Sequence, residues 1–221
     1  MAGPGAQFVT ITEGEAKGLT IGLIPKAGYC SIRKSVWKTY GFRCDRNEVK
    51  RDQTPIRIYI REPITRFISA YRFLNGGEEC GKTRSLTPDV KTFEDFVDRV
   101  LDPDKEGDQH WMPQVSRFDG YNITEMYQFE RIKETWPDYI PLIHINKTSD
   151  NAPYPKLGYR MDEIEKYYAE DIRVWNDLDN HETFTIGEMR EAYDKSVRGL
   201  HLTEKQKELA QAKRAAVRAC M

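Results

Sequence analysis

The sequence lacks any hydrophobic run that approaches the ~20 residues needed for a membrane-spanning helix. Its first residues, 1–15, also lack the basic and apolar regions of a secretory signal. These two absences argue against a membrane-spanning protein and against a secreted one. We therefore expect a cytoplasmic protein that has no membrane segment.

Cysteine is scarce as well, and its four residues form no CxxC pair and no metal-ligand spacing: Cys30, Cys44, Cys80 and Cys220. This spacing excludes the usual zinc modules and favours reduced thiols. An excess of one charge is also missing, because the formal net charge is −1. No global field therefore attracts nucleic acid, and any anion site must be local.

The chain does contain an alternation of short apolar strands and amphipathic helices, without internal repeats. Strands are expected at residues 8–12, 19–24, 56–60, 123–129 and 139–145. Helices are expected at residues 32–40, 63–74, 92–101, 130–137 and 161–178. The alternation predicts an α/β fold of three layers, with helices flanking a mainly parallel central sheet. We expect this domain to span residues 1–180, with a helical C-terminal extension over 181–221 packed on or beside it.

The first candidate site is the loop that follows the strand at 19–24. Pro25 cannot extend a strand ladder, and Gly28 permits a sharp turn. Ser31 is expected to cap the next helix. Free N–H groups and the positive end of a helix dipole suit an anion such as phosphate, and Lys26 adds a full charge. Taken alone, the same stretch also fits an ordinary strand-to-helix turn.

The second candidate site is the end of the strand at 56–60. Arg61 follows that strand directly, and Pro63 suits the first turn of a helix. The Arg61 guanidinium can fork onto a phosphate, with the Ser69 hydroxyl as a further donor. Because ligands bind at the carboxyl edge of a parallel sheet, we expect both loops to contribute to one site with two anion-holding corners.

A third pattern, Gly76 to Thr83, satisfies the nucleotide-loop formula GxxxxGK[ST]. That motif works between a strand and a helix, whereas here it follows a helix, and Pro88 comes soon after it. Glu78 and Glu79 would also repel a phosphate. We therefore interpret this match as accidental.

These motifs resemble those of sulfotransferases that use 3′-phosphoadenosine 5′-phosphosulfate (PAPS). Residues 24–31 are similar to their 5′-phosphosulfate loop, and residues 61–71 match their 3′-phosphate pattern R-x-P-x-x-R-x-x-S-x-Y. His110-Trp-Met-Pro-Gln114 resembles the HW-x-PQ segment of the carbohydrate branch, sulfotransferase family 2, which includes chondroitin and dermatan enzymes. Comparable segments stand at residues 127–130, 146–148 and 168–171. The resemblance covers about residues 19–178.

The resemblance implies PAPS as donor, 3′-phosphoadenosine 5′-phosphate (PAP) as product and no metal. Lys26 would bind the 5′-phosphosulfate and neutralise charge on the leaving oxygen, while Arg61 and Ser69 would hold the 3′-phosphate. The loop N–H groups would come from Ala27, Gly28, Tyr29, Cys30 and Ser31. Cys30 departs from the family, which has a hydroxyl residue there. Arg66 also matches the pattern, but it can equally anchor its helix through a structural ion pair.

An acceptor hydroxyl needs a general base, because its own pKa lies far above neutrality. Among the four histidines we expect His110 to serve, since it lies in an irregular loop where catalytic groups often occur. His144 lies in an apolar strand pattern, and His181 and His201 lie beyond the resemblance. Glu62 and Glu130 remain rival bases, because other sulfotransferase branches use a glutamate.

The expected function is therefore transfer of a sulfuryl group from PAPS to the hydroxyl of an acceptor, a glycan or another small molecule. Two alternatives stay open. One is a nucleotide kinase or other phosphotransferase with a related phosphate loop, and the other is a nucleotide-binding protein without turnover. The sequence also leaves open whether the chain forms a homo-oligomer.

Overall fold

The computed structural model describes residues 6–41, 44–45, 49–50, 53–75, 89–105, 107–143 and 155–180. Several expectations lie outside these residues: the pattern at 76–83, His144, His181, His201, the segment 146–148 and the extension at 181–221. The strands are β1 (Gln7–Ile11), β2 (Thr20–Leu23), β3 (Cys44–Asp45), β4 (Ile56–Ile60) and β5 (Ile123–Gln128). The longer helices are α1 (Tyr29–Tyr40), α2 (Pro63–Asn75), α3 (Phe93–Leu101), α5 (Met161–Tyr167) and α6 (Ala169–Asn180). Three shorter ones are η4 (Val115–Phe118), η5 (Phe129–Arg131) and α4 (Ile132–Thr135).

One mixed sheet joins these strands in the order β3-β1-β2-β4-β5. β2, β4 and β5 run parallel, whereas β1 is antiparallel to both β2 and β3. The α/β class is confirmed, but the expectation of a mainly parallel sheet is wrong. Residues 12–19 are too short a connection for the crossover that parallel strands need, so β1 and β2 form a hairpin.

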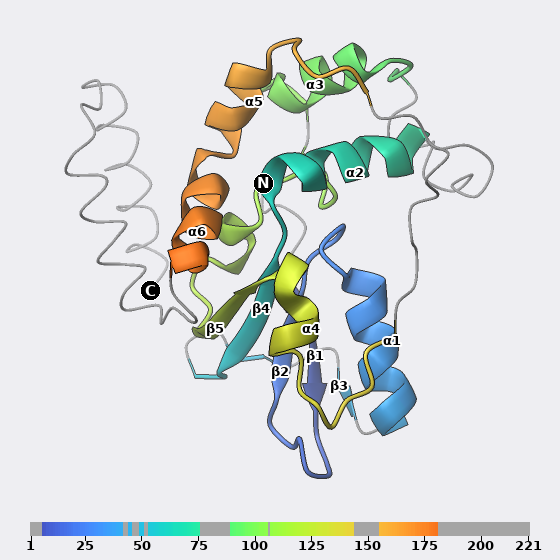
Figure 1. Ribbon diagram of the computed structural model, residues 1–221, viewed down its shortest axis with the longest axis vertical. Helices are drawn as coiled ribbons and strands as arrows, with labels where there is room; N and C mark the ends of the chain where they lie inside the picture. The colour runs from blue at the N-terminus through green and yellow to red at the C-terminus, as the bar shows by residue number, and fades with distance from the viewer. Residues whose placement is uncertain are drawn as a thin grey trace. The chain divides into compact units, whose positions relative to one another are not determined.

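Helices pack on both faces of this sheet (Figure 1). α1 and α4 bury one face, where Ile32 and Ile132 join Leu23 and Tyr59 in one apolar cluster. α6 packs on β5 from the other face. A second cluster joins α2, α3 and α5 around Phe67, and it includes Trp111 from the connecting loop. α2 begins just beyond the carboxyl end of β4, so it places its residues at the edge where ligands are expected (Figure 1).

Local sequence rules hold at several helix ends and fail at one. Pro63 begins α2, and Thr92 with Asp95 forms the predicted capping box of α3. Ser31, however, is not a cap: Gly28 is the N-cap of α1, with φ of 76°, and the helix begins at Tyr29. The left-handed backbone of Gly28 allows this earlier start, which places Ser31 inside the first turn.

Two further elements differ from expectation. Residues 139–143 are not a strand, because other groups take their backbone: Trp136 Nε1 donates to Ile140 O (2.6 Å) and Ile143 N–H donates to Ser35 Oγ (2.7 Å). The helix expected at 161–178 is broken at Tyr168 into α5 and α6. None of the described helices is long and apolar enough to span a membrane.

Candidate functional site

The loop between β2 and α1 has a backbone that suits an anion. Lys26 has a positive φ of 68°, uncommon for a residue with a side chain and often found at functional sites. Two features require glycine at position 28. Its φ is positive, and a Cβ there would lie 2.4 Å from a ring carbon of Phe129. α1 runs for 12 residues and its first turn carries no acidic residue. The positive end of its dipole is therefore not neutralised locally.

Arg66 joins this loop, from the inside of the molecule, to the loop that carries His110. Its side chain is fully buried on α2, and its Nε donates to Pro25 O (3.0 Å). Nη1 donates to Met112 O (2.9 Å), and Nη2 donates to Gln109 O (3.1 Å). Burial lowers the pKa of Arg66, opposed in part by the nearby Tyr168 and Asp171. Arg66 thus acts as a structural clamp. Its hydrogen bonds go to carbonyl groups, whereas the sequence suggested an ion pair.

The segment His110–Gln114 is anchored by α6 and by Tyr168, the residue that precedes this helix. Asp171 is fully buried and accepts from the backbone N–H groups of Gln114 (2.6 Å) and Val115 (3.0 Å). Burial raises the pKa of Asp171 even though these hydrogen bonds oppose the shift. The Tyr168 hydroxyl donates to Trp111 O. Trp111 itself is 1% exposed, so it anchors the loop that carries His110 in the helical cluster.

Arg61 lies where the sequence placed it, at the carboxyl end of β4. Its Nη1 donates to Lys26 O (3.0 Å), which ties the two predicted anion corners together. Gln114 bonds the Arg61 backbone twice, accepting from its N–H (3.0 Å) and donating to its C=O (2.8 Å). Ser69 lies further along α2 and is 7% exposed. Cys30, in the first turn of α1, is a half-buried free thiol.

The two residues expected to carry the chemistry meet on one aromatic ring. Lys26 Nζ lies 4.1 Å from the centroid of the Phe73 ring, within cation–π range. The His110 imidazole stacks on the same ring, with centroids 5.2 Å apart and an interplanar angle of 27°. Phe73 belongs to α2, so this helix brings the phosphate loop and the His110 loop to one place.

The two rival bases have structural roles in this structure. Glu62 accepts from the backbone N–H groups of Ile64 (3.0 Å) and Thr65 (2.5 Å), so its carboxylate caps the first turn of α2. Glu130 accepts from the Glu62 backbone N–H (3.0 Å) and from Trp175 Nε1 (3.2 Å). Both carboxylates therefore help to hold the backbone or a neighbouring side chain, and each oxygen named here accepts a hydrogen bond.

Sequence reasoning missed several residues that build the site. Phe73 carries no motif signal, and its role follows only from the packing of α2. Asp108 could have been found from its spacing, because a carboxylate two residues before a histidine can reach its ring. Gln114 and Asp171 stood inside family-like segments, but their mutual contact joins segments far apart in the sequence.

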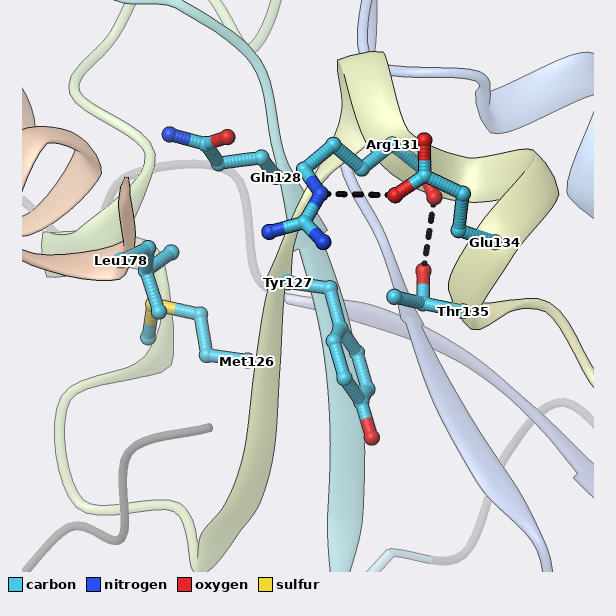
Figure 2. Close-up of a pocket in the computed structure, with 7 residues that line it drawn as sticks. All are labelled: Met126, Tyr127, Gln128, Arg131, Glu134, Thr135 and Leu178. Carbon is cyan, nitrogen blue, oxygen red and sulfur yellow. Dashed lines mark hydrogen bonds and ion pairs between the residues drawn. The ribbon is translucent and has the colours of Figure 1, made fainter. Parts of the chain in front are cut away.

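A separate cavity of about 430 Å³ lies beside β5, the edge strand of the sheet (Figure 2). Its lining comes from β5, η5, α4 and the last turn of α6: Met126, Tyr127, Gln128, Arg131, Glu134, Thr135 and Leu178. Figure 2 shows Arg131 turned toward Glu134, and their side chains are paired at 2.8 Å. Neither Lys26 nor His110 lines this cavity, so it is distinct from the predicted site.

Comparison with known proteins gives one match. A family model described as the sulfotransferase family matches residues 33–176. The matched range includes Arg61, Ser69 and His110, whereas Lys26 and its loop lie just before it. Searches among curated proteins and among solved structures found no match.

Proposed function

The chain belongs to the sulfotransferase family, and from this premise we propose that it transfers the sulfuryl group of PAPS to a carbohydrate hydroxyl. The observation that carries the proposal is the meeting of Lys26 and His110 on the Phe73 ring. A cation for the leaving oxygen and a base for the attacking hydroxyl are the two groups that sulfuryl transfer requires.

The residues present fit a donor that carries phosphate groups at two places. Lys26 and the N-terminus of α1 would hold the 5′-phosphosulfate, with N–H groups from Ala27 to Ser31. Arg61 would hold the 3′-phosphate at the end of β4, with Ser69 as a second donor. Cys30 in place of a hydroxyl residue removes one side-chain contact, but the backbone N–H groups do not depend on it.

The proposed transfer balances without a further reactant. A bond forms between the acceptor oxygen and sulfur, while the bond between sulfur and the bridging phosphate oxygen breaks. The hydroxyl proton passes to His110 Nε2. The electron pair of the broken bond stays on the phosphate oxygen of PAP, where the Lys26 ammonium stabilises the developing charge.

A first test concerns the 3′-phosphate. The wild type should bind PAP more tightly than AMP, because Arg61 and Ser69 contact the phosphate that AMP lacks. Arg61→Ala should shrink this preference by ~1.5–3 kcal/mol, the usual loss for a charge-assisted hydrogen bond. Calorimetry with both nucleotides measures it. AMP serves as the internal control, because any disturbance of the Lys26 loop weakens both ligands alike. Equal affinity of the wild type for PAP and AMP would show that Arg61 does not bind the 3′-phosphate.

A second test concerns Lys26. Lys26→Ala should lower turnover by ~10²–10³-fold while weakening PAP far less, because the ammonium acts most strongly on charge that develops in the transition state. Alanine keeps a Cβ, so the strained backbone at φ 68° is not relieved by this change. Steady-state kinetics and PAP titration separate the two effects. Lys34→Ala, an exposed lysine on α1, is the matched control. A Lys26→Ala enzyme with wild-type turnover would show that Lys26 has only a structural role.

A further inference from the structure

His110 makes two hydrogen bonds to one carboxylate. Asp108 Oδ1 accepts from the His110 backbone N–H (2.9 Å), and the His110 ring Nδ1 lies 2.5 Å from the same oxygen. An ionised carboxylate can only accept, so Nδ1 must carry the proton. Nε2, on the opposite side of the ring, then keeps a lone pair. This is the tautomer that a general base needs.

The surroundings keep Asp108 ionised. Burial alone would raise the pKa of Asp108, but hydrogen bonds from His110 and the positive charge of Arg117 outweigh it and lower the pKa. Arg117, on η4, is 8% exposed and donates to Gln109 O (3.2 Å). Its Nε and Nη2 have no hydrogen-bond partner within the described ranges, so its charge acts on Asp108 through space.

Further charged groups approach His110 from each neighbouring element. Lys26, from the β2–α1 loop, lies over the Phe73 ring on which His110 stacks. Arg66, on α2, is bonded to Gln109 O next to His110. Burial, followed by the charge of Arg66, lowers the pKa of Arg117 to about 10, so Arg117 stays cationic at neutral pH. Asp108 is the carboxylate in direct contact with the imidazole, and a proton gained by His110 is stabilised by it alone among these groups.

We propose that Asp108 is the positioning residue of the acceptor site, holding the His110 ring through Nδ1 so that Nε2 faces the acceptor hydroxyl. The inference rests on the proposed function, because it gives His110 the role of base. Asp108 fixes the tautomer and the ring orientation, and it stabilises the imidazolium that forms when the acceptor proton arrives. The charge of Arg117 adds to the hydrogen bonds from His110 that favour the ionised form of Asp108.

The kinetic test compares Asp108→Asn with the wild type. Asparagine can donate its amide N–H to Nδ1, which selects the wrong tautomer, so kcat should fall ~10²-fold or more. The KM for PAPS and the affinity for PAP should stay close to wild type. The acidic limb of the kcat profile should move to lower pH, because the imidazolium loses its neighbouring negative charge. Asp104→Asn removes an exposed carboxylate from the same connection and should change none of these quantities.

A second measurement needs only the wild-type chain, so it stands even if Asp108→Asn folds poorly. Nitrogen NMR on histidine-labelled protein reports which ring nitrogen carries the proton, and the spectrum of His110→Gln identifies the His110 signals. In the neutral ring we expect His110 to carry its proton on Nδ1. A proton on Nε2 in the wild type would overturn the inference.

The outcomes separate this inference from the proposed function. An inactive His110→Ala enzyme together with a fully active Asp108→Asn enzyme, with an unmoved acidic limb, overturns the role of Asp108 alone. A His110→Ala enzyme with wild-type turnover would instead show that His110 is not the base. The inference about Asp108 and the proposed mechanism both depend on that role. Loss of turnover in both variants, with the shifted limb in Asp108→Asn, supports both.

Discussion

Replacing His110 with alanine is expected to lower turnover by ~10²–10⁴-fold, the usual range for loss of a general base, while PAP affinity stays nearly unchanged. The structure gives the physical reason: the ring contacts Asp108 and Phe73, and neither contact belongs to the loop that would hold the donor. The acidic limb of the rate profile should also disappear, because the group whose protonation causes it is gone. Rates over a pH series, with a PAP titration at each end, measure both effects.

The rival carboxylates provide the controls for this result. Glu62→Gln and Glu130→Gln each keep one side-chain oxygen, which can still accept a backbone N–H now bonded to the carboxylate. We therefore expect both variants to retain most of their turnover. If either one loses transfer without losing PAP affinity, and His110→Ala remains active, then the base is a carboxylate.

Arg66→Lys should destabilise the protein by ~2–4 kcal/mol. The guanidinium donates to three carbonyls, one in the β2–α1 loop and two in the loop that carries His110, and a lysine ammonium cannot reach all three in the same geometry. The change therefore leaves buried carbonyl groups unpaired, each of which costs about 1–3 kcal/mol. Urea denaturation followed by circular dichroism measures the free energy of unfolding.

The matched control for Arg66→Lys is Arg160→Lys. Arg160 is bonded to Asp98 and Glu163 on the surface, where solvent screens the pairs, so its replacement should leave the unfolding free energy close to wild type. An Arg66→Lys protein as stable as Arg160→Lys would show that the clamp is not needed to hold the loops. PAP binding by the folded fraction of Arg66→Lys then tells whether the loops still form the site.

The parts of the fold that could be predicted rest on short-range rules. Pro63 begins α2 because its fixed φ and missing N–H suit a first turn, and Thr92 and Asp95 cap α3 through their own side chains. Ile56–Ile60 is β4 because a short apolar run between polar segments has few alternatives. In each case the deciding residues lie within a few positions of one another.

The errors arise where distant residues decide. Residues 139–143 have a strand-like composition, but the Ser35 hydroxyl on α1 takes the N–H of Ile143. The direction of β1 is a different case, because the short connection between the strands expected at 8–12 and 19–24 already indicates a hairpin. Ser31 is a good cap by type, yet the fit between Gly28 and the Phe129 ring starts the helix earlier.

For the site, the motif residues could be named but their partners could not. Lys26, Arg61 and His110 stand out because their types and spacing match a known chemistry. Phe73 becomes visible only once the His110 loop is folded against α2, whereas Asp108 could have been found from its spacing two residues before His110. Arg66 shows that a motif match can also mislead. Its position in the motif does not tell whether it contacts a ligand or holds loops of the protein together.

The most direct test of the central claim follows the sulfuryl group itself. Wild-type protein is incubated with PAPS labelled with radioactive sulfur, a panel of glycans and EDTA, and both products are separated. We expect label to move to a glycan hydroxyl and PAP to form in equal amount, and we expect His110→Ala to bind PAP while moving ~10²–10⁴-fold less label. Phosphoryl transfer from ATP that requires magnesium, with no movement of sulfur label to any acceptor, would contradict the central claim.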